Sequence, residues 1–323
     1  MLTNLIIGAG QLGSRHLQGL LKFKSEQVIY VLDPSEISLN ISKERAKEVE
    51  NKHNLIYIND WDKLPTKFDL VIVATGANVR SKLVIKLLTN FKVENLILEK
   101  VLFQEINSYS EISNLIKKTK TSTWVNHPRR MFNHYKEIKK IISQSEEKVS
   151  FQVYGENWGL ACNGLHFIDL FSFLSNSEVE HLNFDGVEKV VNSKRLNNIE
   201  FIGSITGALK NGSDFKISSI NGSCADITVC VFTKSNRWII QEGTAQKVIH
   251  LSIENNFNES ITTFKNEFQS NLTTRIINDI LNEEKTTLPN YVEASSSHIP
   301  FIKSALNTYT RITGIKTSIV PIT

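Results

Sequence analysis

The sequence predicts an α/β fold in two parts, a doubly wound parallel sheet followed by an α+β domain. Two observations predict the first part: short apolar runs alternate with helical patterns over residues 1–126, and a glycine-rich turn directly follows the first run. Continuous apolar strands between helices are typical of parallel sheets covered on both faces. A third observation predicts the second part, because residues 127–323 change to alternating, β-branched segments separated by turns.

In the first part we expect six strands, each at an apolar run. They lie at 5–7, 28–32, 55–58, 70–75, 96–98 and 123–125, and helical patterns include 35–51, 79–90 and 106–119. Ligands of such sheets bind at the carboxyl ends of the strands. Gly8, Asp33, Thr75 and Lys100 all fall at these ends.

In the second part the strand patterns predict one antiparallel sheet. They lie at 148–154, 187–191, 199–209, 215–220, 227–232, 238–241 and 247–253. Helical patterns lie at 131–142, 164–174, 261–281 and 299–313. Asn-Gly-Ser turns between neighbouring strands favour hairpins, and hairpins make antiparallel pairs. We therefore place the domains at 1–126 and 127–323.

The glycine-rich turn, Gly8-Ala9-Gly10-Gln11-Leu12-Gly13, stands between an apolar strand and a helical pattern. In this context glycines allow a tight turn and a close approach of the backbone to a pyrophosphate. We therefore predict a dinucleotide-binding Rossmann domain. The expected cofactor contacts are Gly8, Gly10, Gln11, Leu12, Gly13, Asp33, Ser35, Thr75, Gly76, Glu99 and Lys100.

Asp33 ends the second strand, 20 residues after Gly13. An acidic side chain there accepts hydrogen bonds from the ribose diol of NAD and repels the 2′-phosphate of NADP. NAD is the expected cofactor, with NADP as the alternative if Arg15 or Ser35 binds the phosphate. Asp33-Pro34-Ser35 also suits a simple turn and helix cap.

Composition excludes several classes of protein. The 323 residues include 37 basic and 33 acidic side chains, without a long basic run that would track nucleic acid. No apolar stretch approaches the ~20 residues of a membrane span, and no secretory leader is evident, so we expect a cytoplasmic protein. Cys162, Cys224 and Cys230 lack Cys-x-x-Cys spacing. We expect no metal site, because Cys162, His166 and Asp169 would be three ligands on one helix without a second segment.

Four further motifs occur in a fixed order along the chain. His16 follows the glycine turn, Ala74-Thr75 follows the fourth strand, Glu99-Lys100 follows the fifth, and residues 164–169 lie in a later helix. Together these motifs resemble the glucose-fructose oxidoreductase, inositol dehydrogenase and MocA family. The resemblance covers the whole chain. It implies a large, mostly antiparallel open sheet in the second domain, which would make a homodimer or homotetramer. It also implies pyridine-nucleotide redox chemistry on a sugar or polyol carbon.

Two positions depart from the family pattern. Val101 replaces the proline of Glu-Lys-Pro, and Cys162 stands where an aspartate commonly precedes the histidine by four residues. Asn163 or Asp169 could compensate for the missing carboxylate, since residues 162, 166 and 169 share a helical face. Residues 157–166 resemble a subset of proteins from bacterial surface-polysaccharide and acidic-sugar pathways.

Hydride transfer at a carbinol carbon requires a proton to leave or join the oxygen. His166 suits general acid/base catalysis near neutral pH, and Lys100 would polarise the same oxygen. Each could instead be structural, as a core histidine and a solvated lysine. Further substrate contacts are expected from the Arg129 and Arg130 guanidinium groups and from a sugar face stacked on Trp158, with Cys162, Asn163 and Asp169 beside them. The alternatives are that the two arginines form a solvated helix start and that Trp158 fills the core.

The expected protein is therefore an NAD(P)-dependent oxidoreductase acting on a sugar, amino sugar or nucleotide-linked sugar. One alternative is a reductase of the same fold that acts on a non-sugar carbonyl or imine. The other is a nucleotide-binding sensor without catalysis, which Cys162 favours and the presence of both Lys100 and His166 opposes.

Overall fold

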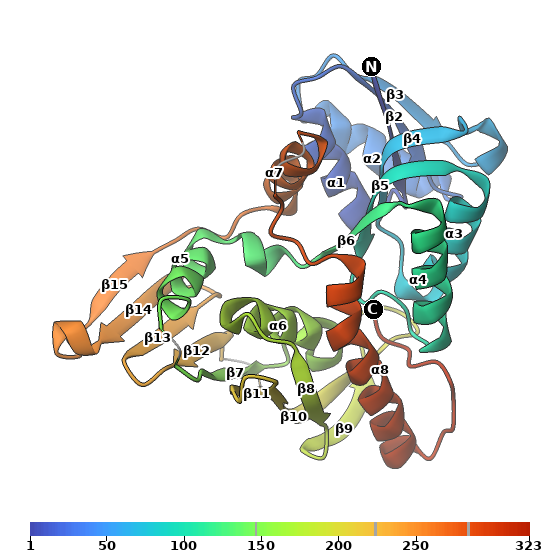
Figure 1. Ribbon diagram of the computed structural model, residues 1–323. Helices are drawn as coiled ribbons and strands as arrows, with labels where there is room; N and C mark the ends of the chain where they lie inside the picture. Colours follow the sequence, from blue (N-terminus) through green and yellow to red (C-terminus); the bar gives the residue numbers. More distant parts are fainter. Residues whose placement is uncertain (146, 223–224, 283–284) are drawn as a thin grey trace. The chain divides into compact units, whose positions relative to one another are not determined.

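The computed structural model describes residues 1–145, 147–222, 225–282 and 285–323, so Cys224 lies outside the described residues. The chain forms two compact units. Unit 1 contains Met1–Phe103, Asn107–Pro128 and Glu267–Val292, and unit 2 contains Gln104–Ile106, Arg129–Asn266 and Glu293–Thr323. Each unit is described by itself below, with the element labels of Figure 1.

Unit 1 is built on a six-stranded parallel sheet, as the sequence predicts. The strands are β1 (Leu2–Ile7), β2 (Gln27–Leu32), β3 (Asn54–Ile58), β4 (Lys67–Val73), β5 (Lys92–Glu99) and β6 (Ser122–Asn126). Their order is β3-β2-β1-β4-β5-β6, which is that of dinucleotide-binding domains. Apolar side chains of the central strands, such as Leu5, Ile72 and Leu96, are fully buried. This burial explains the continuous apolar runs.

Five α-helices of unit 1 connect or cover these strands. They are α1 (Gln11–Leu21), α2 (Glu36–Lys47), α3 (Ala77–Asn90), α4 (Asn107–Thr119) and α7 (Gln269–Leu281). The last comes from far along the chain and packs on α1 (Figure 1). A Cβ atom on Gly19 of α1 would lie 2.5 Å from Thr273 Cβ of α7, so glycine is needed for this close approach.

Unit 2 contains a nine-stranded sheet. Its strands are β7 (Ser150–Glu156), β8 (Val179–Asn183), β9 (Val187–Asn192), β10 (Ile199–Leu209), β11 (Asp214–Ile220), β12 (Thr228–Phe232), β13 (Asn236–Gln241), β14 (Lys247–Ser252) and β15 (Ser260–Thr263). The order is β15-β14-β13-β12-β7-β11-β10-β8, and β9 pairs with β10. The sheet is mostly antiparallel, as expected, but β7 and β11 are parallel.

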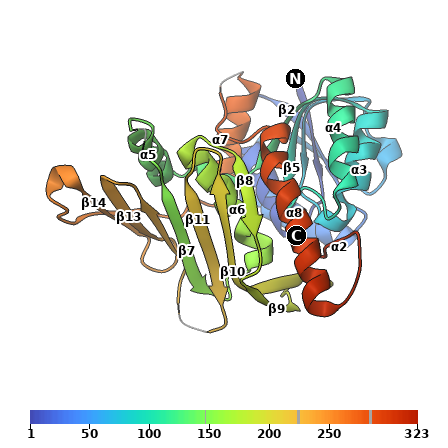
Figure 2. The same ribbon diagram turned by 60° about the horizontal axis from the view of Figure 1, so that its bottom comes forward.

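The helices of unit 2 are α5 (Asn133–Ile142), α6 (Leu160–Ser175) and most of α8 (Tyr291–Thr313). In Figure 2, α6 lies behind β7, β11 and β10. Phe171 of α6 stacks on Phe151 of β7 with ring centroids 4.4 Å apart. Tyr154, on the opposite face of β7, is 48% exposed, so one face of the sheet is covered and the other is open.

The prediction of a helix over 261–281 is wrong in its first part. Residues Ser260–Thr263 form the edge strand β15, and α7 begins only at Gln269. The pattern misled because all four residues of β15 are exposed and carry no alternation of buried side chains. Strands β8 and β15 had no predicted counterpart, and α6 begins four residues earlier than the predicted helix.

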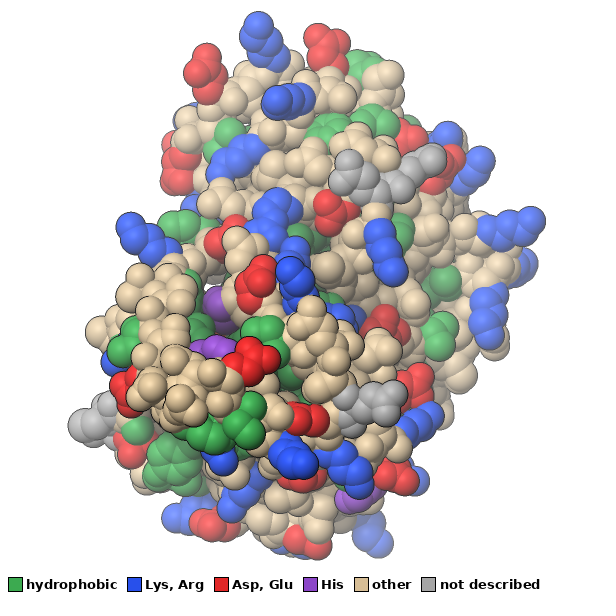
Figure 3. All heavy atoms as spheres, turned by 60° about the vertical axis from the view of Figure 1, so that its left-hand side comes forward, with side chains coloured by type: hydrophobic (Ala, Val, Ile, Leu, Met, Phe, Trp, Pro, Cys, Tyr) green, Lys and Arg blue, Asp and Glu red, His purple; other side chains and the backbone are tan. Residues whose placement is uncertain are grey.

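Short 3₁₀ helices lie at Trp61–Lys63, Pro128–Met131 and Ile253–Asn255. None of the helices in the described ranges is long and apolar enough to cross a membrane. On the face drawn in Figure 3, basic and acidic side chains are interspersed, in keeping with the 37 basic and 33 acidic residues of the chain.

Candidate cofactor and catalytic site

The glycine turn of unit 1 has the geometry that a pyrophosphate site needs. Gly8 has a φ of 97°, which favours glycine. A Cβ atom on Gly13 would lie 1.7 Å from the Gly8 oxygen, so α1 can pack this close only with glycine there. A Cβ on Gly10 would meet nothing within 4 Å, which leaves open space beside the amides that begin α1.

Asp33 lies against this turn. One of its carboxylate oxygens accepts a hydrogen bond from the Ala9 amide at 2.7 Å, and the other accepts one from the Ser35 amide at 2.8 Å. Across the turn, the Thr75 hydroxyl oxygen is buried without a hydrogen-bond partner among the described residues. An open glycine cradle, an acid at the ribose position and an unsatisfied hydroxyl fit a bound dinucleotide.

Gln11 and Leu12 begin α1, exposed and half-buried respectively, and Gly76 is the N-cap of α3. The sequence did not point to Arg45 of α2. Its guanidinium donates to the Gln11 main-chain oxygen at 2.9 Å and to the Ser14 hydroxyl at 2.6 Å. Arg45 therefore fixes the first turn of α1 at the predicted pyrophosphate position.

Glu99, at the carboxyl end of β5, is the centre of a buried hydrogen-bond network. His16 Nε2 lies 2.9 Å and Asn126 Nδ2 lies 2.6 Å from the same Glu99 oxygen. His16 Nδ1 is 2.8 Å from the Thr273 hydroxyl of α7. Desolvation alone would raise the pKa of Glu99, but the His16 and Asn126 hydrogen bonds and nearby positive charge hold it below its ordinary value.

The segment that carries Lys100 is held by Arg80 of α3. This guanidinium, on a side chain that is 1% exposed, donates to the main-chain oxygens of Glu99 at 2.8 Å and Leu102 at 3.2 Å. It also donates to the oxygens of Thr75 and Val101. Lys100 is half-buried at the end of β5. Three of these four carbonyl contacts fix the backbone on both sides of Lys100, and the fourth joins it to the end of β4.

In unit 2, α6 carries Cys162, His166 and Asp169 within one continuous helix. Cys162 is 8% exposed and Asp169 2%, whereas His166 is half-buried. Asn163 donates from its side-chain amide to the Trp158 oxygen at 2.7 Å, so this amide is used to hold the turn before α6.

Trp158 packs inside unit 2. Its indole N–H donates to the Ser218 oxygen at 2.7 Å, and its ring meets Phe167 edge-on at 5.3 Å between centroids. The side chain is 9% exposed. Its contacts are those of a core residue, so a sugar-stacking role would use only a small part of the ring.

The two arginines after β6 are each paired with a carboxylate of unit 2. Arg129 makes a bidentate contact with Glu242, with its Nη2 at 2.6 Å, and lies over the Phe167 ring at 4.1 Å. Arg130 makes a bidentate contact with Asp169, in which both hydrogen bonds are 2.7 Å long. A substrate that binds these guanidinium groups would have to share them with the Glu242 and Asp169 carboxylates.

Beside Arg129, His134 stacks on Phe264 with ring centroids 4.1 Å apart. Burial lowers its pKa from 6.5 to about 4. Between these values the unfolded chain binds a proton that the folded protein does not, so the free energy of unfolding falls as the pH decreases. The loss is about 1.4 kcal/mol per pH unit.

Between pH 4 and 6.5 we expect His134→Phe to flatten the dependence of the free energy of unfolding on pH, as measured by urea unfolding. The exposed control His181→Gln should leave this dependence unchanged. Equal slopes in the wild type and His134→Phe would contradict the assignment.

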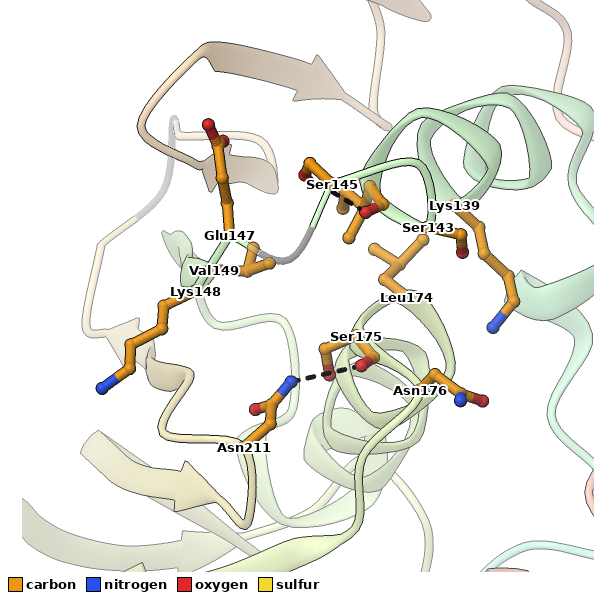
Figure 4. Close-up of a pocket in the computed structure, with 11 residues that line it drawn as sticks. Lys139, Ser143, Ser145, Glu147, Lys148, Val149, Leu174, Ser175, Asn176 and Asn211 are labelled. Carbon is orange, nitrogen blue, oxygen red and sulfur yellow. Dashed lines mark hydrogen bonds between the residues drawn. The ribbon is translucent and has the colours of Figure 1, made fainter.

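Two cavities of unit 2 are lined by residues that do not include His166. One of about 520 Å³ lies at the carboxyl-terminal ends of α5 and α6, where Lys139, Lys148 and Asn211 line it (Figure 4). The second, of about 300 Å³, is lined by residues that include Arg130, Asp169 and Glu293. Among the described residues, no group of three His, Cys, Asp or Glu side chains could hold a metal ion.

A family model matches the first domain of the chain. Residues 2–127 match the model of the GFO_IDH_MocA family, described as an oxidoreductase family with an NAD-binding Rossmann fold. These residues belong to that family. The resemblance read from the sequence is confirmed for this domain, which is an NAD-binding domain. No curated protein matches the chain.

Solved structures share the fold over nearly the whole chain. An Agrobacterium radiobacter oxidoreductase, solved with NAD⁺, L-tartaric acid and magnesium, is 13% identical over 95% of this chain and 97% of its own, with a TM-score of 0.72. UDP-N-acetylglucosamine 3-dehydrogenase from Acidithiobacillus ferrooxidans is 12% identical over 94% and 96%, with a TM-score of 0.68. A super-repressor mutant of Gal80p from Saccharomyces cerevisiae is 12% identical over 96% of both chains, with a TM-score of 0.72.

Proposed function

We propose that the protein is an NAD-dependent oxidoreductase that transfers a hydride between nicotinamide and a carbinol or carbonyl carbon of a sugar. Amino sugars and nucleotide-linked sugars are included in this substrate class. The observation that carries the proposal is Lys100, held by Arg80 at the carboxyl end of β5 in a domain of the NAD-binding family. In doubly wound sheets this edge is where ligands bind.

In the proposed reaction the cofactor accepts or supplies the hydride. His166 takes the proton from the substrate hydroxyl during oxidation and returns it during reduction. The Lys100 ammonium stabilises negative charge on the same oxygen. Glu99 stays ionised in its network with His16 and Asn126, so it holds the main chain beside Lys100 without competing for the substrate proton.

A role in bacterial surface-polysaccharide synthesis is the narrower form of the proposal. It is supported by the resemblance of residues 157–166 to proteins of such pathways and by the structural similarity to a UDP-N-acetylglucosamine dehydrogenase. Incubation with NAD⁺ and UDP-N-acetylglucosamine, N-acetylglucosamine or scyllo-inositol tests it through the absorbance of reduced nicotinamide. If NAD⁺ is reduced with scyllo-inositol but not with UDP-N-acetylglucosamine, the proposal of a nucleotide-linked sugar substrate is contradicted.

Asp33 gives a prediction about the cofactor. Its carboxylate is fixed by the Ala9 and Ser35 amides, so it can accept the ribose hydroxyls and repel a 2′-phosphate. We expect NADH to bind more tightly than NADPH, and Asp33→Ala to reduce that preference by on the order of tenfold or more. Titration followed by nicotinamide fluorescence measures both affinities. Glu36→Ala, three residues away, is the control. Tighter NADPH binding by the wild type would contradict the assignment.

A sensor that binds the cofactor without catalysis is the second candidate. Cys162 in place of the common aspartate favours it, and similarity to the repressor Gal80p shows that the fold is not restricted to enzymes. The two candidates differ in single-turnover hydride transfer. Binding of NAD⁺ and a sugar without any transfer would favour the sensor.

The open face of the unit 2 sheet supports a proposal about assembly. Tyr154 on β7 is 48% exposed and Ile261 on β15 is 56% exposed, so apolar groups remain uncovered within one chain. We propose a homodimer or homotetramer formed through this face. Light scattering measures the mass directly, and a monomer at micromolar concentration would contradict the proposal.

A further inference from the structure

A carboxylate from a neighbouring strand lies on the first turn of α6. Oε2 of Glu200, the second residue of β10, accepts hydrogen bonds from the Ala161 amide at 2.8 Å and the Cys162 amide at 3.3 Å. These are amides that the helix itself cannot satisfy. Glu200 therefore joins the sheet to the helix that carries His166.

The backbone before α6 is shaped around this carboxylate. Gly159, the N-cap of α6, has a φ of 81°. A Cβ atom on Gly159 would lie 2.9 Å from Glu200 Oε1 and 3.1 Å from the Asn163 side-chain nitrogen. A side chain at this position would displace the Glu200 carboxylate or the Asn163 amide, and the positive φ itself favours glycine.

Gly159, Asn163 and His166 are spaced so that they lie on one face of α6. The rise of 1.5 Å per residue places residue 166 about 10 Å along the axis from residue 159. Helical side chains lean toward the N-terminus, which is the end of α6 that Glu200 occupies.

Charge at this end of α6 matters for a histidine that accepts a proton. The helix N-terminus carries roughly half a positive charge, which disfavours an imidazolium nearby. A full negative charge on the first turn reverses the sign of this effect. Over the ~10 Å given by the helical rise, and at an effective dielectric constant of 20, such a charge changes an equilibrium by on the order of tenfold.

We propose that Glu200 is a positioning residue that supplies, from β10, the negative charge that Cys162 does not supply from α6. It anchors the first turn through Oε2 and stabilises the protonated form of His166 when that residue takes the substrate proton. This inference rests on the proposed function, because it assigns His166 as the acid/base.

The test uses the full chain and a series of variants. Glu200→Gln keeps an acceptor for the amides but removes the charge, Glu200→Ala removes both, and Cys162→Asp restores a carboxylate at position 162. Glu188→Gln, at an exposed position on β9, is the matched control. Single-turnover reduction of NAD⁺ is measured with UDP-N-acetylglucosamine, N-acetylglucosamine and scyllo-inositol, together with thermal unfolding and amide exchange at residues 161 and 162.

We expect Glu200→Gln to slow hydride transfer on the order of tenfold while the unfolding temperature and amide protection stay near the wild-type values. Glu200→Ala should also accelerate amide exchange. Adding Cys162→Asp to Glu200→Gln should recover most of the rate, and Glu188→Gln should behave as the wild type. A purely structural role would not give this separation between rate and protection.

The outcomes separate the inference from the proposed function. If the wild type and the Glu200→Gln variant reduce NAD⁺ equally fast, the inference is overturned and the proposed function still stands. Loss of rate only in parallel with lost amide protection, without recovery by Cys162→Asp, would also overturn it. A wild type that transfers no hydride to NAD⁺ from any of the three compounds would overturn the proposed function.

Discussion

Lys100→Met and His166→Ala are each expected to lower turnover by about 10² to 10⁴-fold. Methionine retains most of the length of Lys100 but removes the charge that stabilises the substrate oxygen, and alanine removes the proton acceptor at position 166. The cofactor contacts predicted around the glycine turn and Asp33 are unchanged in His166→Ala. Its NAD affinity should therefore stay close to that of the wild type. Stopped-flow measurement of nicotinamide absorbance gives the rate, and calorimetric titration gives the affinity.

Matched controls separate these effects from general damage. Lys82→Met removes an exposed lysine of α3 in unit 1, and His181→Ala removes an exposed histidine of β8 in unit 2. Neither should change turnover by more than about twofold, because exposed side chains away from special contacts have effects near ±0.5 kcal/mol. Turnover in Lys100→Met or His166→Ala equal to that of the controls would remove the proposed mechanism.

The parallel sheet of unit 1 could be predicted because each signal is local. The apolar runs that give Leu5, Ile72 and Leu96 their burial are continuous in sequence, and the glycine turn joins a strand directly to a helix. The position of Lys100 directly after an apolar run was likewise sufficient to predict that it lies at the end of β5.

The groups that support the site could not be predicted, because their partners are distant in sequence. Arg80 reads as an ordinary arginine in a helical pattern, and only the fold shows that it faces main-chain oxygens near residue 100. Glu200 likewise lies 38 residues along the chain from Cys162, whose main-chain amide donates a hydrogen bond to it. The periodicity of α7 predicts a helix but not that it packs on α1.

Trp158 shows a different limit of sequence reasoning. Glycines and an asparagine around it indicate a loop, which favours ligand contact. In the structure this loop is folded onto β11, so the indole N–H reaches the Ser218 oxygen. A loop composition describes the backbone conformation but not the burial of one large side chain within it.

Asp169→Asn is expected to lower the free energy of unfolding by about 3 kcal/mol, the lower end of the range for breaking a buried ion pair. Arg130 and Asp169 are 4% and 2% exposed, so the neutral side chain would leave a guanidinium charge buried without its main partner. The reduction is limited because Glu293, 44% exposed, still lies 2.6 Å from Arg130. Urea unfolding at neutral pH measures the change. Glu178→Gln breaks the exposed pair with Lys210 and serves as the control, with an expected change within about 1 kcal/mol.

The double variant Arg130→Met, Asp169→Leu decides between a structural and a substrate-binding role for this pair. Removing both charges leaves only the partly exposed Glu293 carboxylate without this partner, so the double variant should be more stable than Asp169→Asn. If the pair only supports α6, the double variant should bind UDP-N-acetylglucosamine or scyllo-inositol as the wild type does. If Arg130 instead contacts a substrate carboxylate or phosphate, the double variant should be stable and should lose affinity for the anionic sugar nucleotide but not for the polyol. Because the bidentate geometry already occupies the Arg130 guanidinium with Asp169, we expect the first result.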